Sequence, residues 1–109
     1  MKQVLFICAA NINRSKTAEI WFSMRHPGNR YQSAGSSRAA CRIHGGNYVT
    51  ESQLQQAHRI ICMDNRNRQH LAVDFGNRFS YKTEVANIPD VYKFLELKLI
   101  FEIIDKIKL

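Results

Sequence analysis

Residues 4 to 19 of the chain read VLFICAANINRSKTAE. The first four, Val4 to Ile7, are apolar and typical of a buried strand, and the segment from Lys16 to Glu19 can start a helix. Between them lies a loop that begins with Cys8 and ends with Arg14. The pattern therefore predicts a strand, a loop that curls around one small space and a helix, with a thiol and a guanidinium beside that space.

The C-x5-R-S spacing indicates an anion-binding loop, because its backbone N–H groups can point at the same place as the guanidinium of Arg14. In that positive environment we expect the thiol of Cys8 to ionise at neutral pH. A thiolate beside a bound phosphoryl group can attack phosphorus while Arg14 holds two of the oxygens, which implies phosphate monoester hydrolysis through a phosphocysteine intermediate. The alternative, in which Cys8 is only a small buried residue at the end of a core strand, stays open. The predicted phosphate-binding loop consists of Ala9, Ala10, Asn11, Ile12 and Asn13.

With these residues the chain resembles a known family, the low-molecular-weight protein tyrosine phosphatases, and within it a short subgroup. The resemblance is strong over residues 1 to 35, moderate over 57 to 72 and weak elsewhere. It rests on the strand and loop around Cys8, on the Ser-Ala-Gly of residues 33 to 35 and on the Cys-Met-Asp of residues 62 to 64. By similarity, Cys8 is the nucleophile, Arg14 binds phosphate and Ser15 stabilises the leaving thiolate. Asn11 and Ser33 would then hold the shape of the loop.

Three residues depart from the family pattern. Ala10 stands where the family has glycine, so the loop is shaped differently if its backbone needs a positive φ there. Asn13 stands where many members carry a second cysteine, and the protective disulfide of those members is therefore not expected. Lys16 replaces a proline in the first turn of the helix and adds a positive charge near the anion site.

The general acid is expected from a late loop. The resemblance implies an aspartate followed by proline and aromatic residues, whereas this chain has the reversed order Pro89-Asp90, followed by Val91 and Tyr92. We predict that Asp90 protonates the leaving group and that Tyr92 forms an aromatic wall for the substrate. The alternative is that Pro89-Asp90 only makes a turn before the last helix.

The chain of 109 residues fits a single domain, residues 1 to 109. Alternating strand and helix patterns predict an α/β protein with three layers, in which helices flank a four-stranded parallel sheet, as in the low-molecular-weight phosphatases. Strands are expected at residues 3–8, 30–34, 58–63 and 79–85. Helices are expected at 16–26, 65–72 and 93–109 and, after a capping Thr50 with Gln53 three residues on, through 54–57. Residues 36–47 are predicted to form a loop near the phosphate site.

Cysteine and histidine spacings predict neither a metal nor a cofactor. The three cysteines, Cys8, Cys41 and Cys62, form no C-x-x-C pair, and the four histidines have no companion carboxylates at ligand spacing. Cys62 lies in an apolar strand and is expected in the core. Cys41 could be the resolving thiol of an arsenate reductase-like reaction, which remains an alternative function.

The formal net charge of +7 suggests an anionic partner. Because the basic residues are scattered, the charge suits attraction of a phosphorylated substrate, phosphotyrosine or another aryl phosphate, better than nucleic-acid binding. No signal peptide or membrane-spanning run is recognised, so we expect a cytoplasmic protein without a membrane partner. A monomer and a homodimer both remain open. A further alternative is a catalytically weak anion-binding or interaction module with the same fold.

Overall fold

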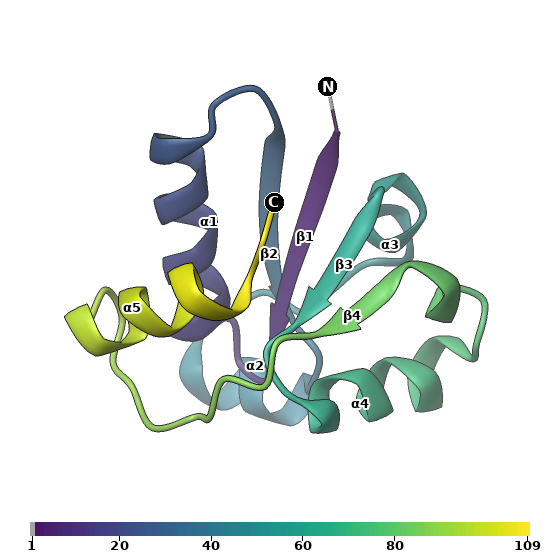
Figure 1. Cartoon of the computed structure of the whole chain (residues 1–109). Coiled ribbons are helices and arrows are strands. Elements are labelled where there is room, and N and C mark those ends of the chain that lie inside the picture. Colours follow the sequence, from purple (N-terminus) through teal and green to yellow (C-terminus); the bar gives the residue numbers. More distant parts are fainter. Residues whose placement is uncertain (1) are drawn as a thin grey trace.

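The computed structural model describes residues 2 to 109 and contains one parallel sheet of four strands (Figure 1). The strands are β1 (Gln3–Cys8), β2 (Arg30–Gly35), β3 (Arg59–Cys62) and β4 (Thr83–Val85). Their order in the sheet is β2-β1-β3-β4, and each neighbouring pair is parallel. The carboxyl ends of β1 and β3 therefore lie side by side, which is where parallel sheets bind ligands.

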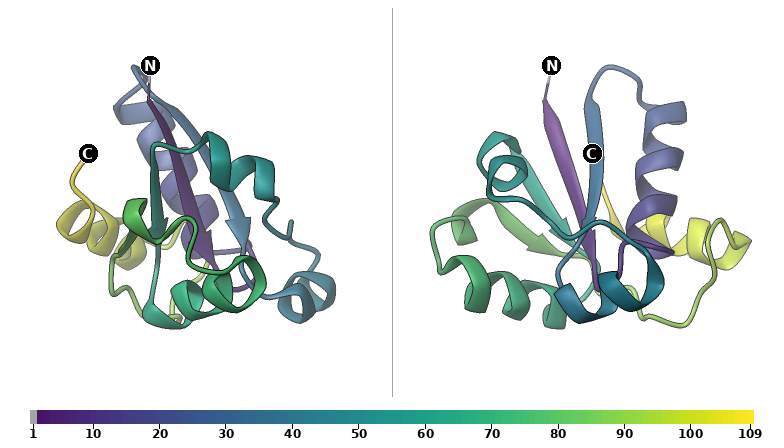
Figure 2. Two further views of the ribbon diagram at one scale, coloured as in Figure 1. Left: turned by 90° about the vertical axis from the view of Figure 1, so that its right-hand side faces the viewer. Right: turned by 180° about the vertical axis from the view of Figure 1, so that it is seen from behind.

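Helices cover both faces of the sheet, and this confirms the predicted three-layer α/β architecture. The helices α1 (Arg14–Arg25) and α5 (Leu97–Lys106) pack on one face, and α3 (Glu51–Gln56) and α4 (Asn65–Phe75) pack on the other (Figure 2). The short helix α2 (Arg38–His44) lies near the carboxyl end of β2.

Alternation along β1 explains the two separate cores. Val4, Phe6 and Cys8 belong to the core under α1 and α5, whereas Leu5 and Ile7 belong to the core under α3 and α4. All five are almost fully buried. A strand that is apolar on both faces is expected at the centre of a parallel sheet, and it fixes the end of β1 as a rigid base for the loop that follows.

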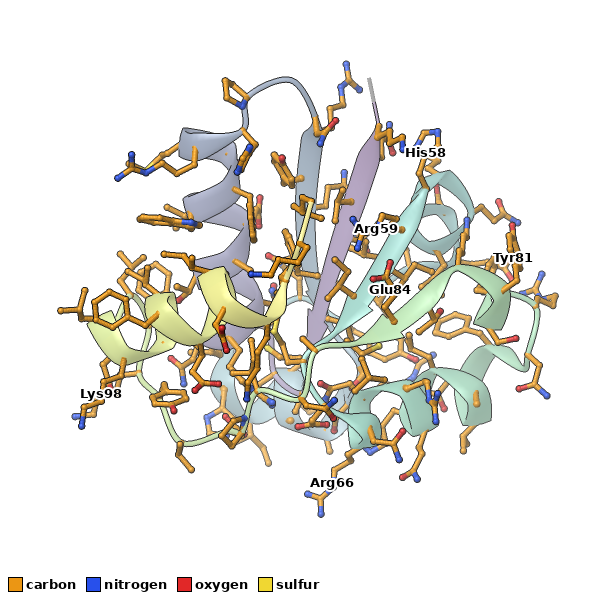
Figure 3. All side chains as sticks on the ribbon, viewed as in Figure 1. His58, Arg59, Arg66, Tyr81, Glu84 and Lys98 are labelled. Carbon is orange, nitrogen blue, oxygen red and sulfur yellow. The ribbon has the colours of Figure 1, made fainter. Side chains whose placement is uncertain are left out.

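The short strand β4 is tied to β3 by an ion pair at the open edge of the sheet (Figure 3). Arg59 of β3 donates from two nitrogens to the two carboxylate oxygens of Glu84, at 2.6 and 2.7 Å. Because both side chains are partly exposed, the pair adds little stability, but its bidentate geometry supports the register of the three-residue strand.

Several elements differ from the sequence prediction. Residues 36–47 were predicted as a loop but contain α2, which Ser37 caps at its start and Gly45, with a φ of 79°, caps at its end. The fourth strand is shorter than 79–85, because a 3-10 turn, η1 (Ser80–Lys82), precedes it. The last helix begins at Leu97 rather than at residue 93. Leu95 has a φ of 59° just before it, and the backbone N–H of Leu95 donates to Thr17 of α1.

The third helix follows its predicted signal. Thr50 and Gln53 form a capping box in which each side chain accepts from the backbone N–H of the other residue. Among the helices of residues 2–109, none is long and apolar enough to cross a membrane.

Candidate active site

The loop between β1 and α1 surrounds a pocket of about 200 Å³. Its base is Cys8 at the end of β1, and Arg14, the first residue of α1, closes the loop. His44 at the end of α2 and Asp90 in the late loop also line the pocket. The structure thus brings the predicted nucleophile, phosphate-binding arginine and general acid to one place. The remaining lining residues are Ala9, Ala10, Ile12 and Asn13.

Cys8 contacts the Ser15 side chain of α1, which in turn binds the Asn11 side chain of the loop. Its sulfur lies 3.0 Å from the Ser15 hydroxyl oxygen, and that oxygen accepts a hydrogen bond of 2.9 Å from the Asn11 amide. Because Asn11 donates to this oxygen, the Ser15 hydroxyl is free to donate its own proton to the sulfur. The contact is what stabilisation of a thiolate requires.

The loop adopts its one left-handed backbone conformation at Asn11, whose φ is 58°. Asparagine tolerates this region better than most residues with a Cβ atom. Ala10 does not have a positive φ, so the steric cost considered for alanine at that position does not arise.

Arg14 is 2% exposed and is anchored on one side of its guanidinium. Its Nη1 donates to a carboxylate oxygen of Asp64 at 2.7 Å and to the carbonyl oxygen of Ile88 at 2.8 Å. Its Nε is buried without a hydrogen-bond partner in the described chain and lies 3.5 Å from a carboxylate oxygen of Asp90. The Nη1 side of the guanidinium is therefore fixed by two hydrogen bonds, and Nε is a buried donor beside the pocket.

Asp64 is a site residue to which sequence reasoning gave no role. It directly follows β3 and caps α4, accepting from the backbone N–H of Asn67. Burial by itself would raise the Asp64 pKa, but the hydrogen bonds from Arg14 and Asn67 outweigh it and lower that pKa below its ordinary value. Its position at the carboxyl end of the strand next to β1 is the sequence signal that could have identified it.

Two predicted site residues lie elsewhere. The Ser33 hydroxyl donates to Glu19 of α1 and not to the loop, because Ser33 pairs with Phe6 in the sheet and shares its face. Tyr92, predicted as an aromatic wall, is half-buried against the core under α1 and α5 and does not line the pocket. The loop is instead supported from Ser36, whose backbone N–H donates to the carbonyl oxygen of Cys8 at 2.9 Å.

All three cysteines are free thiols. Cys41 of α2 is 4% exposed, and its sulfur lies 3.6 Å from the carbonyl oxygen of Ala9. Burial raises the pKa of the Cys41 thiol, and the nearby Cys8 raises it further. Burial likewise raises the pKa of Cys62 to about 12, in keeping with its predicted place in the core. Within residues 2–109, no group of three or more potential ligand side chains is arranged to hold a metal ion.

Solved structures with a similar fold are phosphatases. A low-molecular-weight protein tyrosine phosphatase from Streptococcus pyogenes is 20% identical, with a TM-score of 0.70 over 83% of this chain and 77% of that one. Wzb from Vibrio vulnificus, solved in complex with benzylphosphonate, is 18% identical, with a TM-score of 0.72 over 93% and 88%. The YwlE arginine phosphatase from Geobacillus stearothermophilus is 15% identical, with a TM-score of 0.63 over 94% and 81%. No family model and no curated protein matches the sequence.

At these identities the comparisons establish the fold. The chain has the α/β fold of the low-molecular-weight protein tyrosine phosphatases, which confirms the resemblance seen in the sequence at the level of architecture. The neighbours include enzymes described as acting on tyrosine and on arginine, so the shared fold alone does not select a substrate.

Proposed function

We propose that this protein is a cysteine-dependent phosphatase that hydrolyses phosphate monoesters of aryl alcohols, phosphotyrosine included. The observation that carries the proposal is the arrangement of Cys8, the loop and Arg14 around one pocket at the carboxyl end of β1. The loop encloses a space closed by a guanidinium whose Nε is buried without a hydrogen-bond partner in the described chain. Such a space suits a tetrahedral dianion.

In the first chemical step the Cys8 thiolate attacks phosphorus. The S–P bond forms while the P–O bond to the leaving group breaks, and the leaving oxygen takes a proton from the Asp90 carboxyl group. Arg14 and the loop N–H groups hold the phosphoryl oxygens through the transition state. Asp90 suits the donor role because its exposed carboxyl group lines the pocket.

In the second step water attacks the phosphocysteine. Asp90, now a carboxylate, accepts a proton from the water, the new P–O bond forms and the S–P bond breaks. The electron pair of that bond returns to the Cys8 sulfur, where the Ser15 hydroxyl at 3.0 Å donates a hydrogen bond to the developing thiolate. Asp90 gives up a proton in the first step and regains one in the second, and Cys8 begins and ends as a thiolate. The two steps are therefore balanced without a cofactor.

Two alternatives make different predictions. A binding module with little turnover is favoured by Tyr92, which lies outside the pocket and leaves it without the expected aromatic wall. Arsenate reduction needs a second reactive thiol, and Cys41 is buried with a raised pKa, which makes it a poor nucleophile. A cytoplasmic location and phosphotyrosine as the natural substrate stay predictions from the sequence.

The test is hydrolysis of p-nitrophenyl phosphate from pH 5 to 8 by the wild type and by Cys8→Ser, with Cys41→Ser as the matched cysteine control. We expect Cys8→Ser to lose turnover and Cys41→Ser to keep it. Equal turnover in the wild type and Cys8→Ser would contradict the proposal. Binding of vanadate without turnover would support the binding module, and arsenate turnover that Cys41→Ser abolishes would support the reductase.

A further inference from the structure

The helix α2 is fastened to the phosphate-binding loop at both of its ends. At its start, the backbone N–H of Ser37 donates to the carbonyl oxygen of Ala9 at 3.1 Å, and in the middle of the helix the Cys41 thiol lies 3.6 Å from the same oxygen. Just beyond its end, Gly46 approaches Ala10 so closely that an added Cβ atom would stand 1.6 Å from the Ala10 oxygen. These contacts tie the position of α2 to that of the loop, and the last residue of α2, His44, lies at the pocket.

His44 carries the only ring among the described residues that line this pocket. The other lining side chains are small, aliphatic, polar or charged, and Tyr92 is turned into the core. The pocket has a volume of about 200 Å³, which leaves room beside a phosphoryl group for part of the leaving group. The exposed His44 offers that leaving group a flat surface among the lining residues.

We propose that His44 is the specificity-determining residue of this site and that its imidazole packs against the aromatic ring of the substrate. The inference rests on the proposed phosphatase function and names the residue that selects the leaving group. Planar rings gain from stacked or edge contacts beyond their buried area, and the contacts of α2 with the loop place the backbone of His44 beside the pocket before the substrate arrives. His44 thus supplies the aromatic wall that the sequence assigned to Tyr92.

An alternative role for His44 is attraction of the dianion by a protonated imidazole. The charged side chains that line the pocket are Arg14 and Asp90, and a positive charge on His44 would strengthen the binding of every phosphonate alike. A stacking role instead strengthens only the binding of a ligand that carries a ring. Replacement of His44 by phenylalanine separates the two roles, because it keeps the ring and removes the charge.

The experiment compares benzylphosphonate with methylphosphonate, two anions that the enzyme cannot hydrolyse, by titration calorimetry. The proteins are the wild type, His44→Ala, His44→Phe and, as matched control, Ile43→Ala, whose side chain on the same helix turn is 76% exposed and outside the pocket. We expect His44→Ala to weaken benzylphosphonate binding about 2- to 10-fold and to leave methylphosphonate binding unchanged. His44→Phe and Ile43→Ala should both keep the preference of the wild type for the benzyl ligand.

Three other results would each contradict one part of the proposal. If His44→Ala keeps the full benzyl preference, or weakens both ligands to the same extent, His44 does not select the ring. If His44→Phe loses as much benzyl affinity as His44→Ala, the contact is not a ring contact. If the wild type binds neither phosphonate, the anion site itself is absent and the proposed function fails together with this inference.

Discussion

Replacement of Gly46 by alanine should disable the anion site without changing any residue that lines it. The new Cβ atom would stand 1.6 Å from the carbonyl oxygen of Ala10 and 2.8 Å from its carbonyl carbon. Carbon and oxygen atoms that are not bonded rarely approach below about 3.3 Å, so the gap must open by roughly 1.7 Å. The atoms in the way are backbone, and either the loop at Ala10 or the end of α2 has to move.

The displacement sets the expected magnitude. Overpacking of this kind costs about 1 to 3 kcal/mol of the free energy of unfolding. A reacting group misplaced by about 1 Å loses on the order of 100-fold in rate, so kcat/KM for p-nitrophenyl phosphate should fall by about that factor in Gly46→Ala. Methylphosphonate affinity should fall as well, because the loop N–H groups no longer converge. Turnover, calorimetric affinity and urea unfolding measure the three quantities.

Two other glycines provide controls. Gly28 has open space around an added Cβ atom and no positive φ, so Gly28→Ala should match the wild type in all three assays. Gly45, next to Gly46, also has open space but a φ of 79°, so Gly45→Ala should cost about 1 kcal/mol of stability without steric pressure on the loop. Wild-type affinity and turnover in Gly46→Ala would refute the reasoning, as would an equal loss in Gly28→Ala.

Asp64→Asn should lower the free energy of unfolding by about 1 to 3 kcal/mol at pH 7, because it removes the carboxylate that lies 2.7 Å from Nη1 of the buried Arg14. Since the Asp64 pKa is lowered in the folded protein, the stabilisation is present above the pKa of the unfolded chain and disappears as the pH falls through the folded-state pKa. Urea unfolding of both proteins between pH 7 and 3 should therefore show curves that converge in acid, and a constant difference would contradict the linkage. Asp90→Asn should reduce kcat about 100- to 10,000-fold for phenyl phosphate but much less for p-nitrophenyl phosphate, whose leaving group needs little protonation. Equal losses on the two substrates would show that Asp90 does not protonate the leaving group.

The parts of the fold that the sequence predicted well depend on local signals. The apolar run before Cys8 has the length of a buried strand, and the segment after Arg14 has the composition of a helix. The capping pair of Thr50 and Gln53 acts over three residues and is present as predicted. Such features are visible because the interacting residues are neighbours in the chain.

The helix α2 was missed because its stability is not local. Its seven residues include no strong apolar stripe, and an isolated helix of that length is unstable in water. Contacts with Ala9 and Ala10, about thirty residues earlier in the chain, hold it in place. The role of His44 at the pocket depends on the same kind of distant approach, so no sequence spacing reveals it. Asp64 also meets Arg14 across a long stretch of chain, and only its place just after the strand β3 hinted at a role.

The misplaced residues show a second limit, which concerns orientation. Ser33 was expected at the loop, but the pairing of β2 with β1 decides which face a strand residue occupies, and a shift by one residue would have reversed it. Tyr92 was expected at the pocket, but it lies in an irregular segment before α5 and packs against the core under α1 and α5. Residue type therefore predicted the chemistry of a side chain well. It did not predict where the side chain points when a distant strand pairing or an irregular segment sets the geometry.

The short segment between β2 and α3 gives this site its particular character. In one helix it combines support of the loop, through Ser37 and Cys41, with a surface for the substrate, through His44. We therefore expect any shift of His44 to change the phosphate-binding loop as well, because both depend on the packing of Gly46 against Ala10. Selection of the leaving group and binding of the phosphoryl group are thereby coupled, and the coupling follows from the tight backbone contacts of α2 with the loop.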